Sequence, residues 1–307
     1  MRVFPEMPLD AWRPTKTTLH LYLQIVGKIR LTLHPRVNHW WHVPFYVSAR
    51  GLTTGRIPYE GGNFEIEFDF HGHKLEMRTS SGRYEDFALY DGLTVADFYS
   101  SVFANLAKLG IHAKIWAVPY EAPSTTPFAE DTDNHFYDKE YIERFHRILV
   151  AVDDILQEFR GQFTGKSTPV HVFWHSFDIA LTRFSGRPAP PMPEANMVTR
   201  EAYSHEVISF GFWFGDDKPN SVAAPAFYSY AAPKPDGLEN EPLKPEKAFW
   251  TPDGAMALLM YDDIRASDDA RAKVLDFLES AYQAGAKRAD WNTSALSTKP
   301  VDGELSR

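Results

Sequence analysis

Cysteine is absent from the 307 residues of this sequence. Its absence excludes disulfide bonds, thiolate metal ligands and a cysteine nucleophile. Runs of lysine and arginine are lacking too, and the formal net charge is −9. Because an acidic chain repels phosphate backbones, we expect no nucleic-acid partner.

Long apolar runs are also missing, since none approaches the roughly 18 residues that a membrane-spanning helix requires. We therefore expect no membrane partner. The segment Met1 to Asp10 has a proline, a glutamate and no apolar core, which argues against a signal peptide. These features favour a cytoplasmic protein.

Cofactor-binding sequence motifs are equally scarce. There is no GxGxxG motif followed by a helix, no P-loop, no GxSxG and no EF-hand loop. We therefore expect no nucleotide cofactor and no serine-hydrolase active site.

What the sequence does contain is enough apolar material for a core. Hydrophobic residues make up 44% and aromatic residues 14% of the chain. The alternation of Phe64, Ile66, Phe68 and Phe70 with acidic residues is typical of an antiparallel strand. We predict an α+β fold, with a largely antiparallel sheet and flanking helices. The clearest helices are expected over 94–109, 138–163 and 268–286, and strands over 38–50, 111–116, 170–184 and 203–214.

The segment 17–33 is ambiguous between helix and strand. Leu19, Leu21 and Leu23 alternate like a strand, whereas Leu19, Tyr22 and Val26 form a helical stripe. A possible internal duplication favours the helix. With the halves shifted by 133 residues, six positions are identical without a gap: Leu23 and Leu156, Gln24 and Gln157, Val37 and Val170, Trp41 and Trp174, His42 and His175, and Arg50 and Arg183.

This repeat predicts two pseudo-symmetric halves, each with the order helix, strands, helix. Gly110 with Trp116 and Gly285 with Trp291 are expected to mark equivalent helix ends. We expect the two halves to form one compact unit. The predicted divisions are an N-terminal arm at 1–16, a first half at 17–117, a linker at 118–137, a second half at 138–291 and a mobile tail at 292–307.

Histidine and arginine stand among apolar residues in the second half. If 170–184 is one strand, alternation places His171, His175 and Arg183 on the same face. Buried charge is costly unless it is paired. Either a carboxylate from elsewhere in the core satisfies these groups, or they line a ligand pocket. Asp178 falls on the opposite face from His175, and we expect it to be a structural partner of an arginine or a backbone amide rather than a catalytic residue.

The first half offers His42 and Arg50 on a predicted strand. Eight residues separate them, or roughly 26 Å at about 3.3 Å per residue, so they cannot hold one small ligand within that half. A head-to-tail arrangement of the halves would bring His42 towards Arg183 and His175 towards Arg50. Any shared site is therefore expected between the halves.

Further candidates are Tyr203 and His205, at the start of a predicted strand, and the adjacent Trp40 and Trp41. One tryptophan suits the core and the other a pocket wall. His42, His175 and His205 are candidate catalytic acids or bases, since imidazole titrates near neutral pH. They are also the candidate ligands if a metal is bound, although no HExxH motif supports a metal.

Several long motifs resemble an uncharacterised bacterial family, domain of unknown function 5996. The resemblance covers nearly the whole chain and implies a single full-length unit, and it transfers no catalytic residue. The segments that carry it are Thr18–His20, Gln24–Lys28, Asn38–Pro44, Ala49–Thr54, Phe64–Phe70, Pro169–His171, Thr182–Arg187 and Glu201–Glu206.

Three functions are compatible with these residues. The leading hypothesis is an enzyme that acts on a small anionic, partly apolar substrate by acid–base or metal-assisted chemistry. The alternatives are a non-catalytic ligand-binding protein and a structural protein whose histidines and arginines are satisfied within the core. The pocket would be built from His42, Arg50, His171, His175, Arg183 and His205, with Trp40, Trp41 and Tyr203 as further binding residues.

Overall fold

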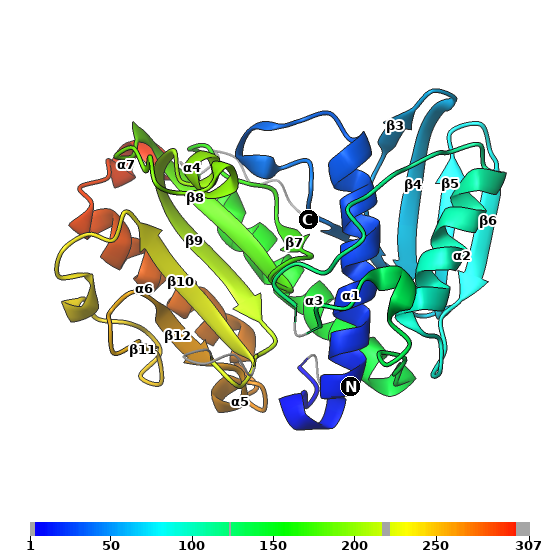
Figure 1. Cartoon of the computed structure of the whole chain (residues 1–307). Helices are drawn as coiled ribbons and strands as arrows, with labels where there is room; N and C mark the ends of the chain where they lie inside the picture. Colours follow the sequence, from blue (N-terminus) through cyan, green and yellow to red (C-terminus); the bar gives the residue numbers. More distant parts are fainter. Residues whose placement is uncertain (1–3, 123, 217–221, 299–307) are drawn as a thin grey trace, which may run out of the picture.

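Two antiparallel six-stranded sheets and their helices form the molecule (Figure 1). The structure is a computed structural model that describes residues 4–122, 124–216 and 222–298. The α+β class with flanking helices is thus confirmed.

In the first half, six strands lie between two helices in the sequence. Its sheet has the order β1-β2-β4-β5-β6, and β3 pairs with β4. Its elements are α1 (Leu9–Leu33), η1 (Asn38–Trp40), β1 (Tyr46–Val47), β2 (Gly51–Thr53), β3 (Ile57–Tyr59), β4 (Gly62–Asp69), β5 (Lys74–Thr79), β6 (Tyr84–Ala88) and α2 (Val95–Lys108).

The second half has the sheet order β11-β12-β10-β9-β8-β7. Helices α3 and α6 lie behind this sheet in the view of Figure 1. The elements are η2 (Phe128–Glu130), α3 (Lys139–Gly161), β7 (His171–Phe173), β8 (Asp178–Pro188), α4 (Met197–Ala202), β9 (His205–Trp213), β10 (Ala226–Ala232), η3 (Leu238–Asn240), β11 (Phe249–Trp250), β12 (Ala257–Met260), α5 (Tyr261–Ile264), α6 (Ala270–Arg288) and α7 (Thr293–Leu296).

The halves join along their first strands. Phe45, just before β1, and Val172 of β7 exchange two backbone hydrogen bonds of 2.9 and 2.8 Å. In each half, a helix is followed by antiparallel strands and then by another helix. The pseudo-symmetry of the two halves stays a prediction. Of the expected matching helix ends, Gly110 follows α2, but Gly285 lies inside α6.

One hydrophobic core is shared by both halves. Tyr22 of α1 stacks on Phe98 of α2, which also stacks on Phe68 of β4, so both helices cover one face of the first sheet. Helix α3 reaches both sheets, because Phe145 contacts Phe70 at the end of β4 and Phe159 contacts Phe210 of β9. The continuous core makes the chain one packed unit.

Helix α1 resolves the ambiguous segment 17–33 and confirms the helix there. Its residues Leu19 to Ile29 are buried on every side, as expected for a helix between two packed layers (Figure 1). The other main helices also begin where predicted. Thr94 accepts a hydrogen bond from the Asp97 amide, and Asp138 caps α3 in the same way.

Three predicted strands are wrong as drawn. Most of 38–50 is a 3₁₀ turn and loop, and 111–116 has no regular structure. The segment 170–184 is two strands separated by a turn at Trp174–Phe177. Left-handed backbone at His39, Trp40 and Phe177, with φ near +60°, produces these turns.

The predicted linker is fastened to α1 by hydrogen bonds. The buried Gln24 amide bonds the backbone of Tyr120 in both directions, at 2.7 and 2.8 Å. The Lys28 ammonium donates to the carbonyls of Trp116 and Val118, and burial lowers the pKa of Lys28 to about 8. Of the predicted mobile tail, 292–298 includes α7, and Ser297 pairs with Phe163. Residues 299–307 lie outside the described part.

Within the described residues, no helix has the length and apolar character that crossing a membrane would need.

A glycine on α1 sets how closely the halves approach. A Cβ atom at Gly27 would lie 2.3 Å from the Trp174 ring, whose Nε1 donates to the Val43 carbonyl. We expect Gly27→Ala to lower the free energy of unfolding by about 1–3 kcal/mol, although alanine is the better helix former by about 1 kcal/mol. Urea unfolding measures this effect. Gly161→Ala is the control because its added Cβ meets no atom within 4 Å, and equal stability of the two variants would contradict the packing argument.

Candidate functional site

A cluster of aromatic and basic side chains lies where η1 of the first half meets β8, β9 and α4 of the second. We call His39, Trp41, Lys166, Phe184 and His205 the seam cluster. The His39 ring lies 4.9 Å from the Phe184 ring and 5.7 Å from the His205 ring. The cluster thus contains Trp41 and His205, two of the predicted site residues, and it combines residues of both halves.

The turn that carries His39 and Trp41 is strained. Both His39 and Trp40 have left-handed backbone, which costs non-glycine residues about 1–3 kcal/mol each. Glu201 of α4 holds the turn by accepting a 3.1 Å hydrogen bond from the His39 amide and by pairing with Arg36. Such strain persists only where the surroundings impose it, and here α4 imposes it.

The hydrogen bonds assign the His39 tautomer. Lysine can only donate, so His39 Nε2 accepts the 2.9 Å hydrogen bond from Lys166 Nζ. His39 Nδ1 therefore carries the proton and donates to the Glu201 carbonyl at 3.0 Å. Burial, followed by the charge of Lys166, lowers the pKa of His39. At neutral pH the His39 ring is therefore a neutral base, and its Nε2 lone pair accepts the hydrogen bond from Lys166.

Lys166 is an exposed cation between two aromatic rings. Its Nζ lies 5.3 Å from the Trp41 ring centroid and 4.9 Å from that of Phe184. Among the residues that the structure describes, no carboxylate forms an ion pair with it. Cation–π contacts at exposed positions contribute only about 0.5–1 kcal/mol. The ammonium therefore keeps donor capacity for an anion.

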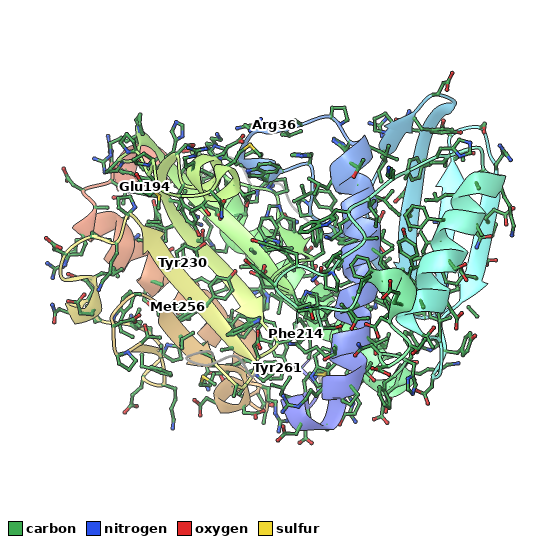
Figure 2. All side chains as sticks on the ribbon, in the orientation of Figure 1. Arg36, Glu194, Phe214, Tyr230, Met256 and Tyr261 are labelled. Atoms are coloured by element: carbon green, nitrogen blue, oxygen red, sulfur yellow. The ribbon has the colours of Figure 1, made fainter. Side chains whose placement is uncertain are left out.

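A row of hydroxyl groups continues from the cluster across the open face of the second sheet. The hydroxyls of Tyr203 and Tyr230 lie 3.0 Å apart. Strand register puts Tyr230 opposite Ser209, whose hydroxyl lies 2.8 Å from that of Thr182. Figure 2 shows Tyr230 on the face that α3 and α6 leave uncovered.

The row ends at a carboxylate. Asp178 accepts hydrogen bonds from the hydroxyls of Ser176 and Tyr228. Its partners are therefore neutral hydroxyl groups, and no ion pair with arginine or lysine is formed among the described residues. Asp178 was predicted to partner an arginine or a backbone amide, whereas the donors in these two hydrogen bonds are side-chain hydroxyls.

The remaining predicted residues do not join the cluster. His42 is buried, its Nδ1 accepts a hydrogen bond from the Val37 amide at 3.2 Å, and its ring stacks against Trp40. Burial lowers the pKa of His42. Arg50 pairs with Asp69 of the first sheet, and the His175 carbonyl accepts a hydrogen bond from His20.

His171 and Arg183 lie on opposite faces of the second sheet. His171 pairs with Ala180, on the face that also carries Tyr228. Arg183 pairs with Ile208, whose side chain faces α6 at Gly285. The prediction that His171 and Arg183 share one face is therefore wrong, because the turn at Trp174–Phe177 interrupts the alternation. Arg183 was also predicted to approach His42. Its guanidinium instead donates a hydrogen bond to the Phe159 carbonyl of α3.

No three histidine or acidic side chains of the described segments form a group that could hold a metal ion. His42, His175 and His205 are all described and are not brought together. Sequence reasoning also missed Lys166 and His39. Lys166 is positioned by its backbone carbonyl, which accepts a hydrogen bond from the Phe184 amide. Such a pairing between distant residues leaves no local pattern in the sequence.

The chain is an α+β protein with two antiparallel sheets, and the seam cluster gathers basic and aromatic side chains from both halves. The chain belongs to a family of unknown function, DUF5996, whose model matches residues 4–298. The suspected family resemblance is thus confirmed. No curated protein and no solved structure matches the chain.

Proposed function

We propose that the chain binds a small anionic, partly apolar molecule at the seam cluster and acts on it by acid–base chemistry. The observation that carries this proposal is the Lys166 ammonium, which has two aromatic rings and a neutral imidazole as neighbours and no carboxylate among the described residues. An anionic group would take its free N–H donors. The Trp41 ring would contact the apolar part of the same molecule.

His39 is the proposed general base. Its Nε2 lone pair is occupied by Lys166 in the structure, and an anion that draws the ammonium away would free it. Because its pKa is lowered, His39 stays neutral at pH values somewhat below the ordinary histidine pKa of about 6.5. Its neighbour His205, held by Ser204 at 3.1 Å, is the proposed proton donor. We propose the cytoplasm as its location.

Removing the Lys166 charge is the direct test of binding. We expect benzoate or phenyl phosphate to bind, and Lys166→Met to weaken binding about tenfold or more, because methionine keeps the ring contacts but cannot donate to an anion. Isothermal titration calorimetry measures this. The neutral isostere benzamide controls for charge, and Lys108→Met of α2 is the matched lysine control. Equal affinity of wild type and Lys166→Met would overturn the proposal.

Turnover distinguishes an enzyme from a binding protein. Once a bound anion is found, mass spectrometry after incubation shows whether it is altered. For an enzyme we expect His39→Gln and His205→Ala to lower kcat with the fold retained, and the acid limb of kcat/KM to lie below pH 6.5, since the pKa of His39 is lowered. Recovery of the ligand unchanged would favour the binding protein.

A further inference from the structure

A cavity lies on the face of the second sheet opposite the seam cluster, between β8, α6 and the C-terminal end of α3. It has a volume of about 270 Å³ and is lined by Arg183, Tyr282, Glu279, Gln162, Ser297 and Thr298 among others. At roughly 30 Å³ for each water, it has the volume of about nine water molecules. The cavity is therefore suited to a small molecule.

Arg183 is a buried cation without a carboxylate partner. Its side chain is 1% exposed, and its guanidinium lies 3.6 Å from the Phe159 ring centroid and 4.5 Å from that of Tyr282. It donates to the Phe159 carbonyl, while its Nε has no hydrogen-bond partner among the described residues. Burial lowers the pKa of Arg183 to about 10. A buried charge without a counter-charge is destabilising by several kcal/mol.

Tyr282 provides a second unsatisfied group at the same cavity. Its hydroxyl is buried and has no hydrogen-bond partner in the part of the chain that the structure describes. More than nine in ten buried polar groups in proteins are hydrogen-bonded, so each exception calls for an explanation. Two such groups at one cavity, a guanidinium and a phenol, together form a set of donors for a carboxylate.

Glu279 contributes the opposite charge. It accepts a 2.7 Å hydrogen bond from Gln283. Burial lowers the pKa of Arg183, and the Glu279 charge opposes part of this effect although the two side chains form no ion pair. The cavity thus has one cationic and one anionic side chain that do not neutralise each other by contact. A ligand that matches both must itself carry both charges.

We propose that this cavity binds a free α-amino acid. The carboxylate of the amino acid accepts hydrogen bonds from Arg183 and from the Tyr282 hydroxyl, and its ammonium group faces Glu279. This site is separate from the seam cluster, because Arg183 and the seam cluster's Phe184 are consecutive in β8 and point to opposite faces of the sheet.

Binding of single amino acids to the full chain tests the proposal. L-serine, L-leucine and L-glutamine are the probes, propionate carries the carboxylate alone, and propylamine carries the amine alone. Saturation-transfer NMR and calorimetry are expected to show binding of at least one amino acid, weaker binding of propionate and none of propylamine. Absence of amino-acid binding at about 10 mM, or propionate binding as tightly as the amino acids, overturns it.

Two variants at the cavity edge locate the site without removing the buried arginine. Tyr282→Phe is expected to weaken amino-acid binding about tenfold. Glu279→Gln is expected to bring amino-acid affinity to within about twofold of propionate, since the ammonium loses its partner. Lys166→Met is the control, and its amino-acid affinity should equal that of wild type. Unchanged affinity in both cavity variants would overturn the assignment even if amino acids bind.

Discussion

Replacing Arg30 by methionine is expected to lower the free energy of unfolding by about 3–5 kcal/mol. Arg30 lies on α1 and is 4% exposed. Its Nε donates to the His42 carbonyl at 2.9 Å, and its Nη1 donates to the carbonyls of Pro44 and Thr54. Methionine fills a similar volume but leaves three carbonyls without their donor. Each carbonyl left without a donor costs about 1–3 kcal/mol. Together these losses outweigh the desolvation free energy that is recovered when the buried guanidinium charge is removed.

Urea unfolding at neutral pH measures the loss. Arg56→Met is the matched control, because Arg56 is exposed and surface substitutions usually change stability by less than about 0.5 kcal/mol. The carbonyls that Arg30 binds follow the strained turn of η1. Arg30→Met is therefore also expected to weaken anion binding at the seam cluster. A change in unfolding free energy below about 1 kcal/mol would show that water replaces the guanidinium.

Periodicity predicted the long helices and the regular strands well. The stripe on α3 and the alternation on β4 are local patterns that burial on one side imposes, and both elements have the expected type. Segments 38–50 and 170–184 misled the prediction because their aromatic composition suits a strand. The chain turns at His39, Trp40 and Phe177, where the backbone is left-handed. None of these residues is glycine, so the sequence carries no signal for a turn at these positions.

The residues that the structure brings together were only partly predicted. The spacing argument placed any shared site between the halves, and of the residues predicted for it, the seam cluster contains Trp41 and His205. Alternation then failed for Arg183, since one turn in the middle of a supposed strand reverses which face a side chain takes. Lys166 could not be found from local sequence, because its neighbours come from η1 and β8.

Acid should destabilise this protein steeply, and His171 is expected to be the main cause. Its side chain is 1% exposed, and burial, followed by the nearby charge of Arg30, lowers its pKa to about 3. The unfolded chain takes up a proton near the ordinary value of 6.5, whereas the folded protein does not until about pH 3. Stability is therefore fully present above pH 6.5 and is lost progressively as the pH falls to about 3. The full loss is about 5 kcal/mol, at about 1.4 kcal/mol for each pH unit.

His171→Leu separates this effect from that of other buried histidines, since His39, His42 and His146 also have lowered pKa values. Urea unfolding at pH 7, 6, 5 and 4 should show a loss about 3 kcal/mol smaller in the variant than in wild type. His112→Leu, which removes an exposed histidine, should follow wild type. The same pH dependence in wild type and His171→Leu would mean that the folded protein accommodates a protonated His171. Arg30 would then have to move away, so the interaction between these two residues is tested as well.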